Sequence, residues 1–320
     1  MNQTEQQPAL AVSSSLLVGY SVGSGFQFLI ILAIIKSPDW TFNSGWVLIV
    51  SLACSDLLNS VPSAFGSFQS LLGRNLFPLS PWLIGYLANL GWSCTALHMN
   101  ALAINRLVAV CLPMHFSIVC STRNSVGVIA VCWVFSVIQA TFSSVLLPCC
   151  AVVWGREWAM TTYYNPENAH NYIAPVHTTL TYCCIAVPAV LYTVISCQLM
   201  KRRFCPQVQV QNSNPIDLKL CLQFLIIICM YTMFDASWYV VAWLEIDGPI
   251  LDFIPFLGVI QFTGNPYIYL AFNSTIRQAV RKLIGWPESA TVAVAPPRVG
   301  TKTHKTAGKQ QLPPVNENKM

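Results

Sequence analysis

Seven long apolar stretches, each nearly free of charged residues, follow one another along the chain. The first, Ala11–Ile35, contains no Asp, Glu, Lys or Arg, and a helix needs only about 20 apolar residues to cross the hydrocarbon layer of a membrane. The six others that meet this criterion are Ser44–Leu72, Trp82–Ile104, Asn124–Ala151, Tyr172–Met200, Leu218–Trp243 and Ile250–Phe272. Charged residues make up 9% of the chain, against about 25% in soluble domains. We therefore predict an all-α membrane protein, a bundle of seven transmembrane helices.

The distribution of basic residues predicts how this bundle is oriented. Of the 17 Lys and Arg residues, only Arg74 and Arg156 fall in segments on the same side of the membrane as the N-terminus. The side that is rich in Lys and Arg stays in the cytoplasm. We therefore expect a multi-pass protein of the plasma membrane with its N-terminus outside and its C-terminus inside. Its net charge of +5 then faces anionic headgroups of the lipid bilayer, and no nucleic-acid partner is expected.

The two ends of the chain differ from the bundle in composition. After the seventh stretch, Ile276 and Val280 recur at helical spacing with basic residues on the opposite face, which predicts an amphipathic helix on the inner membrane surface. The following segment is rich in Pro, Lys and Thr without periodicity, which is typical of disorder. The sequon at Asn2 is a glycosylation site if it lies outside the cell. The predicted regions are an extracellular N-terminus (1–10), a seven-helix domain (11–272), an amphipathic membrane-surface helix (273–286) and a disordered cytoplasmic tail (287–320).

The 13 cysteines do not indicate a disulfide-linked scaffold. Most of them lie within the apolar stretches or on the predicted cytoplasmic side, where thiols stay reduced. Only Cys149 and Cys150 approach the predicted outer face, and neighbouring cysteines rarely reach the geometry of a disulfide. We therefore expect no structural disulfide.

Asp56 stands in the middle of the second stretch, where a charged side chain costs about 2.5–3.5 kcal/mol. It must therefore face the interior of the bundle, where Thr95 and Asn265 are polar groups that can converge on it. Two interpretations remain open. Asp56 is either a structural hydrogen-bond hub or, with Thr95 and Asn265, the site of a bound sodium ion or proton.

Two further polar positions lie within or at the ends of spans. Arg106 follows Asn105 at the inner end of the third stretch, where an arginine can simply extend toward lipid headgroups. Pro266 follows Asn265 in the seventh stretch, where a proline removes a backbone hydrogen bond and permits a kink. Each of these signals is weak on its own.

Taken together, the motifs have the order and spacing of a known family. The sequence resembles the rhodopsin-like G-protein-coupled receptors in Ser51-Leu52-Ala53-Cys54-Ser55-Asp56, Asn105-Arg106-Leu107, Pro113, Trp133, Pro188 and Asn265-Pro266-Tyr267-Ile268-Tyr269. More narrowly, segments 104–113 and 264–277 resemble nematode chemosensory receptors of serpentine receptor class X. The resemblance implies a rhodopsin-like seven-helix bundle followed by a short amphipathic eighth helix.

The resemblance also implies roles for individual residues. Arg106 would engage a heterotrimeric G protein, and Asp56 would be the carboxylate of a sodium site. The residues that the resemblance associates with coupling and activation are Asn105, Arg106, Pro113, Asn265, Pro266 and Tyr269.

Several departures from the family pattern are visible. Asn105 replaces the acid that usually precedes the arginine, and the asparagine usual in the first span is replaced near Gly25. Leu218–Trp243 has no proline and no Cys-Trp-x-Pro, so the family's sixth-helix toggle cannot be transferred. Pro81 and Trp82 stand where a disulfide-forming cysteine is expected.

The most plausible ligand site lies between the outer halves of the helices, where a few polar groups in an apolar wall set specificity. Asp235 is predicted to lie in the outer half of the sixth span. An unpaired carboxylate there favours a cationic ligand, although a hydrogen bond to a neighbouring tyrosine or tryptophan is the alternative. His177 is either a structural histidine or a group that responds to pH. The ligand candidates are Asp235, Trp238, His177, Tyr182, Tyr86 and Asp252.

The function that fits these observations is a chemosensory receptor that binds a small extracellular molecule and activates a heterotrimeric G protein. A multi-pass transporter or channel without G-protein coupling is the alternative, but intramembrane charge is scarce and paired broken helices are lacking. An enzyme is not expected, because the spans contain no metal or nucleophile motif. No cofactor is expected other than the sodium ion, since Ile250–Phe272 has no lysine to bind retinal.

Overall fold

The computed structural model describes residues 3–38, 40–146, 151–155, 160–163, 173–204, 215–244 and 253–286. Its elements in chain order are α1 (Gln3–Ile35), η1 (Trp40–Phe42), α2 (Ser44–Leu71), α3 (Ser80–Cys111), η2 (Pro113–His115), α4 (Phe116–Val119), α5 (Thr122–Thr141), η3 (Phe142–Leu146), β1 (Val152–Gly155), β2 (Met160–Tyr163), α6 (Ile173–Phe204), α7 (Pro215–Leu244), α8 (Ile254–Phe272) and α9 (Ser274–Leu283). The predictions at Asn2, Cys149, Cys150 and Asp252, and for the tail 287–320, lie outside the described residues.

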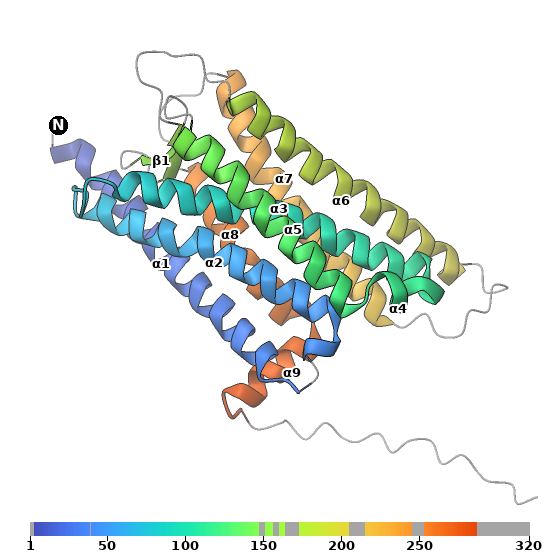
Figure 1. Cartoon of the computed structure of the whole chain (residues 1–320). Helices are drawn as coiled ribbons and strands as arrows, with labels where there is room; N and C mark the ends of the chain where they lie inside the picture. Colours follow the sequence, from blue (N-terminus) through green and yellow to red (C-terminus); the bar gives the residue numbers. More distant parts are fainter. Residues whose placement is uncertain are drawn as a thin grey trace, which may run out of the picture. The chain divides into compact units, whose positions relative to one another are not determined.

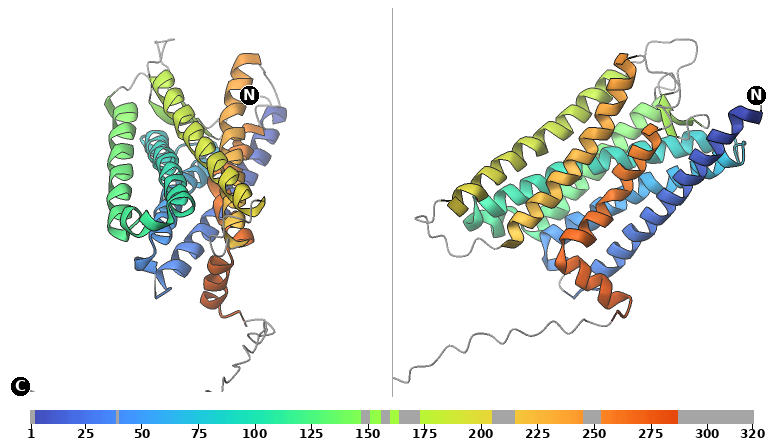
Figure 2. Two further views of the ribbon diagram at one scale, coloured as in Figure 1. Left: turned by 90° about the vertical axis from the view of Figure 1, so that its right-hand side faces the viewer. Right: turned by 180° about the vertical axis from the view of Figure 1, so that it is seen from behind.

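The long helices α1, α2, α3, α5, α6, α7 and α8 run side by side as a bundle, and each overlaps one predicted stretch (Figure 1). Helix α3 is central, because it packs against α2, α5 and α6, while α8 packs against α1, α2 and α7 (Figure 2). The predicted all-α, seven-helix fold is confirmed, with one small β-hairpin added.

Five of the described helices are long and apolar enough to cross a membrane by length and composition. They are Leu10–Ile35, Ser44–Leu71, Ser80–Cys111, Thr122–Val145 and Thr181–Lys201. In α7 the described apolar part, Leu225–Ser237, is shorter. In α8 the buried polar residues Gln261, Thr263 and Asn265 interrupt the apolar sequence. Both helices nevertheless occupy places in the bundle, where Gln223 of α7 and Gln261, Thr263 and Asn265 of α8 are buried.

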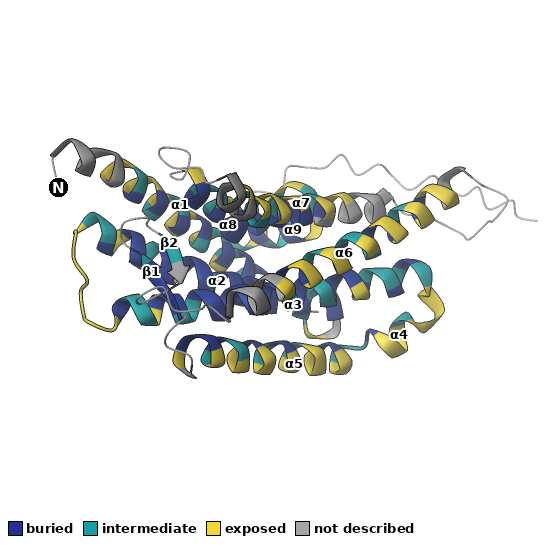
Figure 3. Cartoon of the chain, turned by 90° about the horizontal axis from the view of Figure 1, so that it is seen from above, coloured by how far each residue is buried: buried dark blue, intermediate teal, exposed yellow. Residues whose placement is uncertain are grey.

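The outer surface of the bundle is apolar, as a lipid environment requires. Helix α5 buries only Ser125, Cys132, Ser136 and Ala140, which lie along one side at spacings of four or seven residues. Figure 3 shows exposed residues along the opposite side of α5, where its large apolar side chains lie. Small residues on the inner face let helices approach closely in a membrane, where apolar side chains gain little by facing protein instead of lipid.

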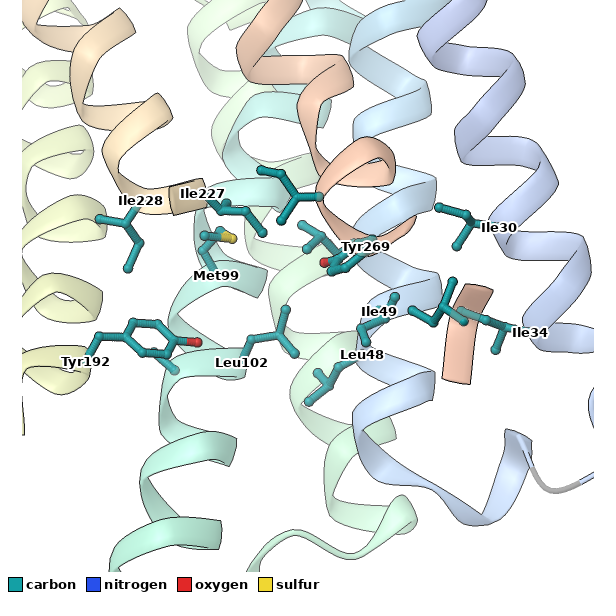
Figure 4. Close-up of a cluster of buried hydrophobic side chains, with 14 of the residues drawn as sticks. Ile30, Ile34, Leu48, Ile49, Met99, Leu102, Tyr192, Ile227, Ile228 and Tyr269 are labelled. Carbon is teal, nitrogen blue, oxygen red and sulfur yellow. The ribbon is translucent and has the colours of Figure 1, made fainter. Parts of the chain in front are cut away.

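Two apolar clusters fill the interior. The larger cluster joins residues from α1, α2, α3, α6, α7, α8 and α9, and includes Ile34, Leu102, Tyr192 and Tyr269 (Figure 4). The smaller cluster consists mainly of aromatic side chains and lies in the other half of the bundle; its buried members are Leu16, Tyr20, Ile84, Trp92, Trp154 and Phe262.

Helices α2 and α3 pack backbone against backbone at Gly91. A Cβ on Gly91 would lie 2.7 Å from the carbonyl oxygen of Ser55 and 2.8 Å from the amide nitrogen of Asn59. Both neighbours are backbone atoms of α2 and cannot move aside. Any larger residue at position 91 would therefore force the two helices apart.

The hairpin β1–β2 covers the end of the bundle near the smaller cluster. Its strands are antiparallel, with Trp154 opposite Thr161. Trp154 is 3% exposed, packs directly over Gly66 of α2, and donates from Nε1 to Ser70 Oγ at 3.3 Å. A buried side chain of the hairpin thus holds it against the helices. All described cysteines are free thiols.

Helix α9 begins and ends with regular capping motifs. Asn273 is the N-cap, and its side chain accepts hydrogen bonds from the backbone N–H groups of Thr275 and Ile276. At the other end, Gly285 has a φ of +70°, Gly285 N–H donates to the Lys282 carbonyl, and Trp286 N–H donates to the Arg281 carbonyl. This is a Schellman motif, which needs a left-handed residue. Helix α9 therefore lies within the predicted region 273–286 and packs against α1 and α8.

Candidate functional site

The structure brings together Asp56, Thr95 and Asn265, which the sequence placed at one candidate site. Asp56 on α2 is completely buried. Thr95 Oγ1 on α3 donates to Asp56 Oδ1 at 2.8 Å, and Asn265 Nδ2 on α8 donates to Asp56 Oδ2 at 2.6 Å. One carboxyl group thus joins three helices, and both of its oxygens accept a hydrogen bond.

Oxygen acceptors remain available around this carboxyl group. Asn265 Oδ1 is buried and accepts no hydrogen bond from the described residues. Gln261 lies one turn before Asn265 on α8 and is completely buried, and neither of its amide atoms has a hydrogen-bond partner among the described residues. Hard cations prefer such carboxylate, amide and hydroxyl oxygens. No group of three or more His, Cys, Asp or Glu lies together in the described part of the chain. The cluster contains the carboxylate of Asp56, and a single negative charge suits a monovalent ion.

Arg106 lies near the end of α3, beside the start of α2. One of its guanidinium nitrogens is 3.5 Å from the position that a Cβ on Gly45 would take. Its neighbour Asn105 is buried and donates from Nδ2 to Ser44 Oγ at 3.4 Å. Burial raises the pKa of the Cys120 thiol above its ordinary value, while the nearby positive charge of Arg106 acts in the opposite direction. Arg106 is therefore positioned where α2, α3 and the segment before α5 meet.

The segment that follows α3 exposes large apolar side chains. Pro113 begins η2, and Met114 is 87% exposed. Ile118 on α4 is 71% exposed, and Leu112 is also exposed. Contiguous exposed apolar residues at the end of a bundle mark a surface for a membrane or a protein partner.

Prolines inside two helices free carbonyl groups that neighbouring helices then bind. Pro266 has no N–H to donate to the Phe262 carbonyl, and Gln27 Nε2 on α1 donates to that carbonyl at 2.7 Å. Pro188 likewise leaves the Cys184 carbonyl without a helical donor, and Asn100 Nδ2 on α3 donates to it at 3.4 Å. Interhelical amides of this kind are how membrane bundles accommodate proline.

Gln27 corrects an expectation about the first span. The family's asparagine position was assigned near Gly25, but a Cβ on Gly25 would meet no atom within 4 Å, so this face of α1 points out of the bundle. Gln27 points inward, binds α8, and accepts at Oε1 from Ser60 Oγ on α2 at 3.2 Å. The polar connection between α1, α2 and α8 is therefore made two residues later.

A second polar network links α2, α3 and α5. His98 Nδ1 lies 2.7 Å from the Cys94 carbonyl and Nε2 lies 2.8 Å from Ser51 Oγ. Trp133 Nε1 donates to Ser51 Oγ at 3.0 Å. These contacts fit the neutral histidine with its proton on Nδ1, because Ser51 can then donate to Nε2 and accept from Trp133. His98 is a structural residue here, and every polar atom in the triad has a partner.

A cavity between α3, α6 and α7 contains the first ligand candidate, Asp235. Its volume of about 20 Å³ is enough for about one water molecule. Its lining residues are Trp92, Ala96, Met99, Thr181, Cys184, Ile185, Pro188, Ile228, Tyr231 and Asp235. Sequence reasoning missed Trp92 and Tyr231, since an aromatic residue inside an apolar span carries no signal of which way it faces.

The other ligand candidates do not line this cavity. Tyr86 is half-buried between α3 and α5, with its hydroxyl 3.3 Å from Thr141 Oγ1. Tyr182 is 52% exposed on α6. His177 and Trp238 are helical positions of α6 and α7 whose side chains lie outside the described residues.

The activation candidates of the seventh span are all in α8. Pro266 is buried inside the helix, and Tyr269 is 1% exposed within the larger apolar cluster (Figure 4). The hydroxyl of Tyr269 is buried without a hydrogen-bond partner among the described residues. Tyr269 lies in the same cluster as Leu102, one turn before Arg106 on α3.

Known proteins are similar to this chain in fold or in sequence. Squid rhodopsin superposes with a TM-score of 0.71 at 15% sequence identity, covering 89% of this chain and 88% of that chain. The thyrotropin-releasing hormone receptor of Mus musculus is 26% identical over 205 residues, and that of Bos taurus is 24% identical over the same length. These alignments cover 61% of this chain and 51% of each receptor, so the chain spans about half the length of the curated relatives it matches.

A family model covers almost the whole described bundle. The model of the serpentine type 7TM GPCR chemoreceptor Srt matches residues 2–293. The assignment to class X is corrected, because the class that matches is Srt, and the motifs compared are too short to separate the two. The chain belongs to the Srt family of serpentine-type seven-transmembrane G-protein-coupled chemoreceptors, which are multi-pass membrane proteins.

Proposed function

We propose that the protein is a plasma-membrane chemoreceptor that binds a small extracellular molecule in the cavity between α3, α6 and α7 and activates a heterotrimeric G protein. The observation that carries the proposal is that one helix contributes to both places. Helix α3 lines the cavity with Trp92, Ala96 and Met99, and it carries Arg106 seven residues after Met99. Seven residues of helix span about 10 Å. A shift of α3 at the cavity therefore moves Arg106 as well.

The size of the cavity supports a change of shape on binding. Space for about one water molecule is too small for most ligands, so binding has to widen the cavity. A ligand that fits only the widened form shifts the population toward it. The wall formed by α6 contains Pro188, which leaves the Cys184 carbonyl without a helical donor. The hydrogen bond that this carbonyl accepts from Asn100 is long, at 3.4 Å, so α6 is the helix that moves when the cavity widens.

The proposed orientation places the N-terminus outside the cell. The end of the bundle that holds Arg106 then faces the cytoplasm, since this end also carries most Lys and Arg residues. On this side Arg106 and Pro113, together with the exposed Met114 and Ile118, form the G-protein contact surface, and the buried Asn105 holds the end of α3 against Ser44 of α2. Asn265, Pro266 and Tyr269 rearrange with α8 when the contact surface opens. In the same proposal, Ile276 and Val280 hold α9 against the bundle while its basic residues meet lipid headgroups.

The Asp56 cluster supports a sodium site in the resting bundle. Asp56, Thr95 and the free Oδ1 of Asn265 supply oxygens from three helices. A sodium ion among them would add positive charge that stabilises the buried carboxylate and would hold the three helices together. The same contacts also fit a purely structural hub, and replacing sodium in the buffer separates these two roles.

A cell-based assay of Arg106 tests the coupling part of the proposal. Receptor variants that carry a tag ahead of Met1 are expressed with a promiscuous G protein, and small volatiles and secreted metabolites are screened for calcium responses. Arg106→Ala is expected to abolish the calcium response to any active compound. The loss of a charged contact with the G protein should weaken coupling by about 100-fold or more. The tag should remain accessible on unpermeabilised cells.

Lys36→Ala is the matched control, because Lys36 is an exposed basic residue at the same end of the bundle. Its response should equal that of the wild type. Signalling that survives Arg106→Ala contradicts the role of Arg106, and a tag reached by antibody only after permeabilisation contradicts the orientation.

A further inference from the structure

Asp235 is the acidic group in the wall of the cavity. It is half-buried on α7, and its carboxylate makes no hydrogen bond or ion pair with any other described residue. Asp56, by contrast, accepts two hydrogen bonds. A charged group inside a membrane bundle is costly when it has no partner. The geometry around Asp235 therefore leaves room for a partner that the described chain does not supply.

The walls beside Asp235 are aromatic and apolar. Trp92 and Tyr231 are 8% and 6% exposed and line the cavity together with Met99. The remaining lining residues are Ala96, Ile185, Pro188, Ile228, Cys184 and the polar Thr181, and among the described residues no Lys, Arg or His lines the cavity. A carboxylate that shares a cavity with tryptophan and tyrosine suits an organic cation, which pairs with the charge and is attracted by aromatic rings.

We infer that the ligand class of this receptor is a small organic cation, a protonated amine with a short apolar body, whose ammonium group pairs with Asp235. The inference rests on the proposed function, since it takes the same cavity as the ligand site. The ammonium group replaces the missing partner of the carboxylate, and the apolar body contacts Trp92 and Met99. The small volume of the cavity favours amines of a few carbon atoms.

The position of Asp235 also connects the ligand to the core of the bundle. Tyr231 lies one turn before Asp235 on the same helix, lines the cavity, and has Asp56 in its immediate surroundings. An ammonium group that draws Asp235 toward itself therefore turns the part of α7 that touches the Asp56 cluster. The cation thus acts on the contact between α7 and α8.

Binding is tested on the full-length receptor in lipid nanodiscs without a G protein. The probes are isobutylamine and isobutanol, which have the same carbon skeleton and differ in the charged group. Isobutylamine at millimolar concentration is expected to raise the melting temperature of the wild type, because a ligand that binds the folded state stabilises it. Isobutanol is expected to leave the melting temperature unchanged.

Variants on α7 locate the effect. Asp235→Asn should require about tenfold more isobutylamine for the same shift, the size of a lost ion pair in a partly buried site. Asp235→Glu should retain most of the shift. Thr232→Val, an exposed position on the same helix, is the matched control and should behave as the wild type.

The inference is overturned if isobutanol stabilises the receptor as well as isobutylamine does, if Asp235→Asn keeps the full shift, or if isobutylamine and its homologues of three to six carbons all leave the wild type unchanged. Agonists that are all neutral would also overturn it while leaving the receptor function intact. An amine that binds through Asp235 without activating any G protein would support the inference and contradict the proposed function.

Discussion

The two sides of α3 are built in different ways. On the side of α2, backbone meets backbone at Gly91, and the carboxyl group of Asp56 accepts two short hydrogen bonds. On the side of α6 and α7, the contacts run through side chains, a cavity remains, and Asp235 has no partner among the described residues. The first side is a fixed interface and the second is an adaptable one.

This difference indicates where a receptor of this kind can change shape. Two helices that pack backbone against backbone cannot shift relative to each other, because any movement creates a clash or a gap. Interfaces of long side chains and single hydrogen bonds can be rearranged at a low free-energy cost. We therefore expect α6 and α7 to move relative to α3 while α2 and α3 stay together. Substitutions at the α2 interface and at the α6–α7 interface should differ in their effects.

The largest expected effect is at the glycines. Gly91→Val places atoms against the backbone of α2 and should destabilise the bundle by about 3 kcal/mol or more, the upper range for overpacking. Gly264→Ala on α8 meets only the flexible end of Met230 and should cost about 1 kcal/mol or less. Melting temperatures in nanodiscs and surface levels measure both. Equal losses in the two variants would contradict the distinction between the interfaces. Gly25→Val, at a position with no neighbouring atoms, serves as the neutral control.

The next effect is at the two acids. Asp56→Asn leaves one of the donors Thr95 and Asn265 without its acceptor and should lower the free energy of unfolding by about 1–3 kcal/mol. Asp235→Asn removes no described contact and relieves the cost of an unpaired charge, so it should raise the free energy of unfolding of the ligand-free protein rather than lower it.

Sodium sharpens this comparison. Exchange of sodium for potassium should lower the melting temperature of the wild type and of Asp235→Asn, but not that of Asp56→Asn, if the cluster holds a sodium ion. A wild type that melts at the same temperature in both salts leaves Asp56 as a structural hub.

The smallest effect is expected at the amides that bind the proline-freed carbonyls. Gln27→Leu removes a hydrogen bond of 2.7 Å to the Phe262 carbonyl and one of 3.2 Å from Ser60, and should cost about 1–2 kcal/mol. Asn100→Leu removes a bond of 3.4 Å to the Cys184 carbonyl on the adaptable side and one of 2.9 Å to the Ala96 carbonyl of its own helix, and should cost roughly half as much. Unfolding in graded denaturant resolves differences of this size. A larger loss for Asn100→Leu would mean that the α6 interface is more firmly held than its geometry indicates.

Much of the fold could be predicted because helix length and charge scarcity are strong signals in membrane proteins. The convergence of Asp56, Thr95 and Asn265 was predictable too, since a buried acid requires polar neighbours and few are available. Helix rotation was not predictable. In a helix that meets lipid on one side and apolar protein on the other, no amphipathic pattern separates the two faces. For this reason the sequence did not indicate that Gln27, two residues after Gly25, faces the interior of the bundle. For the same reason it did not indicate that Trp92 and Tyr231 line the cavity.

The hairpin was missed for a different reason. Val152, Val153 and Trp154 directly follow a predicted apolar span, so the sequence predicts a loop after that span and gives no separate signal for a strand. Only the position of Gly66 across the bundle shows that Trp154 has a place to pack. A contact between residues so far apart in sequence is not visible in local periodicity.

The attachment of α5 has a thermal consequence. Its large apolar side chains face outward, and hydrogen bonds hold it to the bundle. Trp133 donates to Ser51, Ser93 donates to Gln139, and Asn89 donates to Ser143 of the adjoining π-helical turn. Hydrophobic association weakens on cooling because it depends on the release of water. Detaching α5 in lipid hydrates almost no apolar surface, so its heat-capacity change is small. The fourth crossing should therefore remain docked in the cold, where a helix held by water release would loosen.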